Sequence, residues 1–154
     1  MRRTLSPVAA AVVLFSALAL CFTCVQVSPP EPAEGAARDG VLLHVSHGPE
    51  DPHRVLMALR MAEIMAEDHD VLMYFDIRGV YVVLEDAPDL EREPFASSRT
   101  AIPKLLEAGV RIVACPSCLE VAEKTPDDLM DGVETATKEA FFDFTDGRIL
   151  SLDY

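Results

Sequence analysis

Two cysteines lie three residues apart in Cys115-Pro116-Ser117-Cys118, directly after the apolar run 110–114. A cysteine that ends a strand and opens a helix has free backbone N–H groups and the positive end of the helix dipole beside its sulfur, and both favour the thiolate. Cys118 follows one helical turn later, so its thiol can reach Cys115. The pair can form a disulfide, carry sulfur as a persulfide, or hold a soft metal ion. Alternatively, Cys115 is a small buried side chain without chemistry.

The chain has four histidines, which are the other candidates for a base or a ligand. His47 follows the apolar run 41–45 and is a candidate neighbour of Cys115, as a base or as a partner of its thiolate; the alternative is an exposed loop histidine. His44 lies within that run and is interpreted as a core residue. A closed zinc site needs four ligands, and no second pair of closely spaced cysteines exists outside the N-terminal apolar segment. We therefore expect no resident metal and no cofactor.

Apolar runs and helical stripes alternate along residues 41–154, which predicts an α/β domain with a mostly parallel sheet and helices on both faces. The runs interpreted as strands are 41–45, 71–75, 110–114, 133–136 and 148–152. The stretches interpreted as helices are 53–67, 98–108, 119–124 and 137–142. Residues 80–84 remain ambiguous between strand and short helix. Asp51 and Pro52 are typical of a helix start.

The strands must position the cysteines, because reactive loops of parallel sheets lie beyond the carboxyl ends of the strands. Three such loops, 44–51, 76–79 and 115–118, are expected to meet at one edge.

An apolar segment without charged residues, Val8–Val27, follows Arg2 and Arg3. About 20 apolar residues suffice to cross a bilayer as a helix, and the two arginines predict that the rest of the chain is translocated. Residues 1–27 are therefore predicted to be a signal peptide or a membrane anchor, with lipidation at Cys21 or Cys24 as a further alternative. Residues 28–40 are rich in Pro, Glu and Ala and predict a flexible linker, so that the localisation is membrane-anchored or extracytoplasmic, including the periplasm.

The formal net charge of −13 makes the chain strongly acidic. Such a surface repels phosphate backbones, so nucleic acid is not expected as a partner. The acidity itself is explained by solubility.

Three segments resemble the DsrE/DsrF-like family. They are the loop His47-Gly48-Pro49-Glu50-Asp51-Pro52, the segment from Glu107 to Leu119 that includes Cys115, and Asp128-Leu129-Met130-Asp131-Gly132-Val133. Their order along residues 41–154 is that of the family. The resemblance implies a five-stranded α/β fold, homo-oligomers, a helical 80–84 segment, and a reactive cysteine at Cys115 that carries sulfur as a persulfide. The apolar N-terminal segment and the second cysteine, Cys118, depart from the family's cytoplasmic relay members.

These observations predict an exported, membrane-tethered sulfur carrier or thiol-redox protein, with the character of a sulfurtransferase. Cys115 is the expected nucleophile, Cys118 its resolving partner and His47 a candidate base. The partners would be sulfur donor and acceptor proteins or small sulfane-sulfur species, together with the membrane through residues 8–27. The alternative is a non-catalytic oligomeric binding module in which Cys115, Cys118 and His47 hold Cu(I) or Zn(II).

Overall fold

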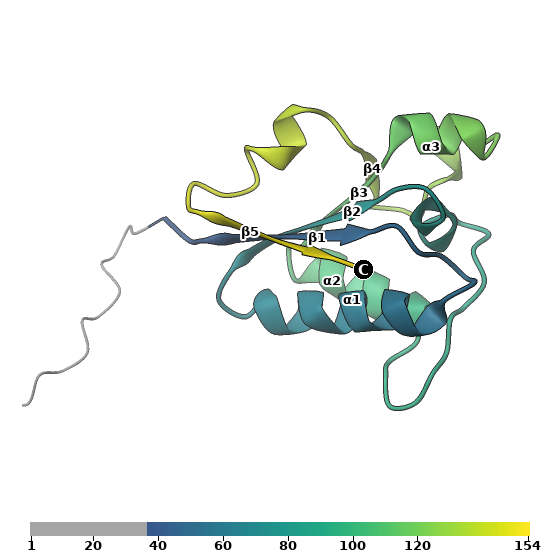
Figure 1. Cartoon of the computed structure of the whole chain (residues 1–154), viewed down its shortest axis with the longest axis horizontal. Coiled ribbons are helices and arrows are strands. Elements are labelled where there is room, and N and C mark those ends of the chain that lie inside the picture. The colour runs from purple at the N-terminus through teal and green to yellow at the C-terminus, as the bar shows by residue number, and fades with distance from the viewer. Residues whose placement is uncertain (1–36) are drawn as a thin grey trace, which may run out of the picture. The chain divides into compact units, whose positions relative to one another are not determined.

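A parallel sheet forms the centre of the structure, a computed structural model that describes residues 37–154 (Figure 1). The strands are β1 (Gly40–Val45), β2 (Asp70–Phe75), β3 (Arg111–Ala114), β4 (Glu134–Thr135) and β5 (Ile149–Asp153). They form one five-stranded sheet in the order β4-β3-β2-β1-β5, and every neighbouring pair runs parallel. The predicted parallel α/β architecture is therefore confirmed.

Two helices cover one face of this sheet (Figure 1). They are α1 (Pro52–Met65) and α2 (Ser98–Glu107). As predicted, α1 begins after Asp51, whose side chain accepts a hydrogen bond from the Arg54 amide, with Pro52 in the first turn. Gly109 follows α2 with a φ of +85°, a left-handed conformation that a side chain would disfavour.

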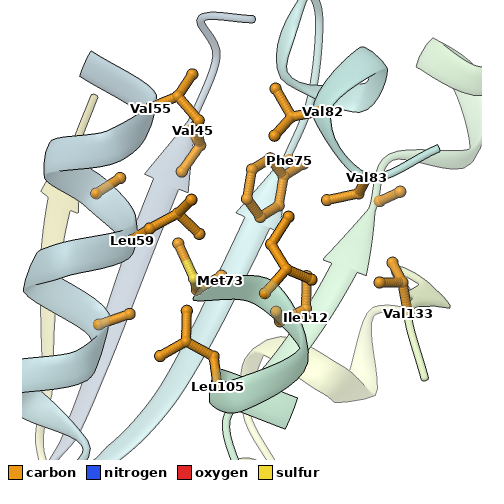
Figure 2. Packing of buried hydrophobic residues seen from close by; sticks show 14 of the residues in the cluster. Val45, Val55, Leu59, Met73, Phe75, Val82, Val83, Leu105, Ile112 and Val133 are labelled. Carbon is orange, nitrogen blue, oxygen red and sulfur yellow. The ribbon is translucent and has the colours of Figure 1, made fainter. Parts of the chain in front are cut away.

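Alternate residues of the strands face these two helices and form the main core. In β1 and β2 they include Val45, Met73 and Phe75, which meet Leu59 of α1 and Leu105 of α2 (Figure 2). All five side chains are fully or almost fully buried. The residues between them along each strand point to the opposite face of the sheet, which is called here the site face.

The remaining helices are short and lie around the sheet. They are α3 (Pro116–Val121) and the 3₁₀ helices η1 (Gly79–Val82), η2 (Pro126–Asp128) and η3 (Glu139–Phe141). Figure 1 shows α3 and η3 on the side of the sheet away from α1 and α2. A small apolar cluster on the site face joins Leu72 and Val113 to Phe144, with Tyr74 and Phe141 packed against it.

Several elements differ in detail from the sequence-based expectation. Residues 79–82, in the stretch that the sequence left open between strand and short helix, form a single turn of 3₁₀ helix, which agrees with the helix implied by the family resemblance. The expected helix 137–142 is reduced to the single 3₁₀ turn η3. The expected helix 119–124 begins earlier, at Pro116, immediately after Cys115.

The predicted N-terminal apolar segment, residues 1–27, lies outside the described residues, as does most of the predicted linker. Between residues 37 and 154, none of the helices combines the length and the apolar character needed to cross a membrane.

Candidate functional site

The carboxyl edge of the sheet brings the three predicted loops together. The Ile77 amide, after β2, donates a hydrogen bond of 3.1 Å to the Cys118 sulfur, after β3. The Arg78 amide donates to the Ser46 carbonyl oxygen at the end of β1. A Cβ atom on Gly79 would lie 2.1 Å from the Val45 carbonyl oxygen, so only glycine permits this approach without a shift of the backbone. The prediction of one shared edge is confirmed.

Cys115 is the residue at which β3 ends and α3 begins. Its amide still belongs to the sheet and donates a 2.8 Å hydrogen bond to the Phe75 carbonyl oxygen, while its backbone adopts the extended conformation of a helix N-cap. Pro116 then occupies the first position of α3. Cys115 and Cys118 are both free thiols and both partly exposed, so reagents can reach them.

The two thiols differ in acidity. Burial alone would raise the pKa of Cys115, but the neighbouring Tyr74 hydroxyl and Cys118 thiol, together with the Cys118 and Ser117 amides, lower the pKa below its ordinary value. Burial raises the pKa of Cys118, as does the neighbouring Cys115 thiol, against the opposing effect of the hydrogen bond from the Ile77 amide. Cys115 is therefore the thiol that ionises first, and Cys118 is the neutral thiol beside it.

Tyr74 reaches the site from near the carboxyl end of β2. Its ring stacks on the His44 ring with centroids 5.4 Å apart and meets the Phe141 ring edge-on at 5.0 Å. Burial, followed by the neighbouring Cys115 thiol, raises the pKa of the Tyr74 hydroxyl well above its ordinary value. Tyr74 therefore stays protonated and can act as a hydrogen-bond donor to the sulfur.

Next to Tyr74, His44 lies between two carboxylates. Its Nε2 atom is 2.9 Å from the Asp76 carboxylate and its Nδ1 atom is 2.9 Å from the Asp153 carboxylate. Ser46 donates a 2.8 Å hydrogen bond to Asp76. Burial alone would lower the pKa of His44, but hydrogen bonds to Asp76 and Asp153 raise the pKa above its ordinary value. His44 thus favours the charged imidazolium.

The interpretation of His44 as a core residue is wrong. It is half-buried on the site face and paired with carboxylates, because alternation along β1 directs its neighbours Leu43 and Val45, and not His44, toward the helices. His47 is half-buried at the start of the following loop, and its Nδ1 atom is buried without a hydrogen-bond partner. Within residues 37–154 neither thiol forms a hydrogen bond with His47, so its role as a base stays a prediction.

A metal site does not follow from this arrangement. Among the described residues there is no group of three or more His, Cys, Asp and Glu side chains placed to hold an ion. His47 therefore does not join the two thiols in a set of three ligands.

Sequence reasoning missed Tyr74, Asp76 and Asp153. One signal was available, because residues 74 and 76 alternate with the buried residues 73 and 75 at the end of an apolar run that precedes a loop of the expected edge. No local signal indicated Asp153, which meets His44 only through the pairing of β5 with β1.

The family model for the DsrE/DsrF-like family matches residues 39–146. This range includes Cys115 and Cys118 and the polar side chains of His44, Tyr74 and Asp76, but not Asp153. The chain belongs to the DsrE/DsrF-like family. This membership is compatible with a role in sulfur relay, and it agrees with the resemblance inferred from the motifs.

Two solved structures share the DsrE-like fold. The ychN protein from E. coli is 17% identical, with a TM-score of 0.58, and the match covers 75% of this chain and 99% of that chain. MTH1491 from Methanobacterium thermoautotrophicum, described as a protein of unknown function, is 20% identical, with a TM-score of 0.53. The match covers 73% of this chain and 98% of that chain. At these identities the two structures show the fold alone. No curated protein sequence matches the chain.

Proposed function

We propose that this member of the DsrE/DsrF-like family is a sulfur carrier or thiol-redox protein in which Cys115 is the nucleophile and Cys118 the resolving thiol. The observation that carries this proposal is the division of roles between the two sulfurs. Neighbouring hydrogen-bond donors, the Tyr74 hydroxyl first among them, lower the pKa of Cys115, and burial together with the neighbouring Cys115 raises the pKa of Cys118. A thiol of low pKa beside a second thiol of higher pKa suits thiol exchange, in which the first attacks as a thiolate and the second resolves the intermediate.

Sulfur loading follows from the thiolate. Cys115 attacks the outer sulfur of a donor persulfide R–S–SH, the S–S bond of the donor breaks, and its electron pair leaves with R–S⁻. The product is Cys115–S–SH. An acceptor thiolate then attacks the outer sulfur, and the electron pair of the broken bond returns to the Cys115 sulfur.

Cys118 provides a second outcome for the loaded protein. After losing its proton, Cys118 attacks the inner sulfur, HS⁻ leaves, and the Cys115–Cys118 disulfide forms. A dithiol reductant must then supply two electrons to restore both thiols. This step distinguishes a carrier that only passes sulfur on from a protein that releases sulfide.

We also propose that the domain acts outside the cytoplasm, attached through residues 8–27 or released after cleavage. The sequence of the apolar segment, with Arg2 and Arg3 ahead of it, supports this proposal. Fractionation of cells that produce the tagged protein, followed by protease treatment of spheroplasts, tests it. Recovery of the protein inside the spheroplasts, with digestion only after their lysis, would contradict it.

The test of the chemistry is the intact mass of the purified protein after treatment with polysulfide. Wild type should gain sulfur that a reductant removes, Cys115→Ser should gain none at this site, and Cys118→Ser should keep its sulfur longer. Because Cys21 and Cys24 can also react, peptide mapping must assign the added sulfur to Cys115. A wild-type Cys115 that remains unmodified, although alkylating reagents reach it, would contradict the proposal.

A further inference from the structure

Tyr74 and Cys115 are neighbours on the site face because of strand register. Tyr74 pairs with Val113 across β2 and β3, and Phe75 pairs with Ala114. Cys115 is two residues beyond Val113 and therefore points to the same face, one step diagonally from Tyr74. The hydrogen bond from the Cys115 amide to the Phe75 carbonyl oxygen extends this register to the cysteine itself.

The Tyr74 ring is held on two sides. His44 stacks on one side with an interplanar angle of 22°, and Phe141 meets the ring edge-on with an interplanar angle of 80°. The ring also packs against the apolar cluster that contains Leu72 and Val113. A ring held in this way keeps its hydroxyl in place, so little conformational freedom is lost when the hydroxyl donates a hydrogen bond.

We propose that Tyr74 is a further catalytic residue, whose hydroxyl donates a hydrogen bond to the reacting sulfur of Cys115 whenever that sulfur carries negative charge. The inference rests on the proposed function and assigns a role that the cysteine motif alone does not contain. The pKa directions of the two groups agree with it, since the same contact raises the pKa of Tyr74 and lowers that of Cys115.

The hydroxyl would act at two points of the reaction. Before loading, it stabilises the thiolate that attacks the donor sulfur. During transfer, the acceptor thiolate takes the outer sulfur, and the electron pair of the broken S–S bond returns to Cys115, where the hydroxyl stabilises the departing thiolate. The lower the pKa of a leaving thiol, the faster it leaves. Tyr74 keeps its proton throughout, and no oxidant or reductant is needed.

The experiment compares Tyr74→Phe with wild type. This variant retains the ring that contacts His44 and Phe141 and removes only the hydroxyl. The pH dependence of alkylation at Cys115, followed by peptide mapping of the full-length protein, gives the pKa of this thiol. Loss of one charge-assisted hydrogen bond should raise the pKa and lower the thiolate fraction of Cys115 about tenfold at pH values below it.

Tyr81→Phe is the matched control. The Arg78 guanidinium lies over the Tyr81 ring, 4.9 Å from the ring centroid, and Tyr81 is not among the main groups that shift the pKa of Cys115. In this control, the Cys115 thiol should titrate as it does in wild type. If Tyr74→Phe also leaves the Cys115 titration unchanged, the proposal is overturned.

A second variant keeps the test decisive if Tyr74→Phe folds poorly. Replacing Tyr74 by 3-fluorotyrosine keeps the hydroxyl and makes it a stronger donor, so the pKa of Cys115 should decrease. An increase or no change would refute the role of the hydroxyl. Because these titrations need no sulfur donor, they can succeed even if the protein accepts no sulfur, which separates a failure of this inference from a failure of the proposed function.

Discussion

Replacing His44 by Phe tests whether the histidine is charged in the folded protein. The change keeps an aromatic ring against Tyr74 but removes both N–H donors from between Asp76 and Asp153. The Asp76 side chain is only 16% exposed, and it would retain Ser46 as its remaining donor. Removing the cation from beside it should therefore destabilise the protein.

The size of the expected destabilisation follows from the solvent exposure of the Asp76 and Asp153 carboxylates. A hydrogen bond from a charged donor to a partly buried carboxylate contributes about 1.5–3 kcal/mol. The bond to Asp153 contributes at most about 1 kcal/mol, because this side chain is 77% exposed and water screens the pair. At about pH 6, where the imidazole is charged, we expect His44→Phe to lower the free energy of unfolding by about 2 kcal/mol.

The destabilisation caused by His44→Phe should depend on pH, and the direction of this dependence is the decisive test. The pKa of His44 is raised in the folded state, so its charge stabilises the fold fully below the unfolded pKa. This contribution is lost as the pH rises through the folded pKa. The difference between wild type and variant should therefore decrease toward about pH 9, where the neutral ring still donates one hydrogen bond.

Urea unfolding at the two pH values measures this difference, with His53→Phe as the control because His53 is exposed on α1 and lies beside Phe95. The control should show no comparable pH dependence. A His44→Phe effect that is equal at both pH values would refute the reasoning, because it would mean that the imidazole is not charged between its two carboxylates.

Three further predictions concern the framework of the site. Phe75→Ala should destabilise the protein by about 3–5 kcal/mol, since the side chain is fully buried; an effect below about 1 kcal/mol in urea unfolding would contradict this packing. Gly79→Ala should destabilise by about 1–3 kcal/mol, because its Cβ would lie 2.1 Å from the Val45 carbonyl oxygen; a melting temperature equal to that of wild type would show that the loop has room. Asp51→Ala should cost about 1 kcal/mol and accelerate hydrogen exchange of the Arg54 amide, which Asp51 caps; unchanged exchange would exclude the cap.

Much of the fold could be predicted because its strands are buried. Apolar runs such as 71–75 are visible in the sequence, and their alternation with helical stripes limits the sheet to a parallel arrangement. The cysteine motif was equally visible, because a strand end that opens a helix is a local pattern. The boundaries of the short turns, such as η3, were not predicted, since so few residues leave no periodic signal.

The rest of the site depends on contacts that no local pattern contains. His44 and Asp153 are 109 residues apart and meet only because β5 pairs with β1. Tyr74 and Cys115 meet because the register of β2 and β3 sets them one diagonal apart. Predicting such pairs from one sequence would require the strand order and register together, and several strand orders fit the same alternating pattern.

The alternation of β2 has a consequence for how this protein can change by insertion or deletion. Met73 and Phe75 belong to the core, while Tyr74 and Asp76 lie on the other face, where they interact with Cys115 and Cys118. A slip of one residue in the pairing of β2 would exchange the two faces, burying a carboxylate under the helices and exposing an aromatic core residue. Loss of a single codon here should therefore abolish folding and chemistry together, whereas the loops beyond the opposite edge can change in length without altering the register.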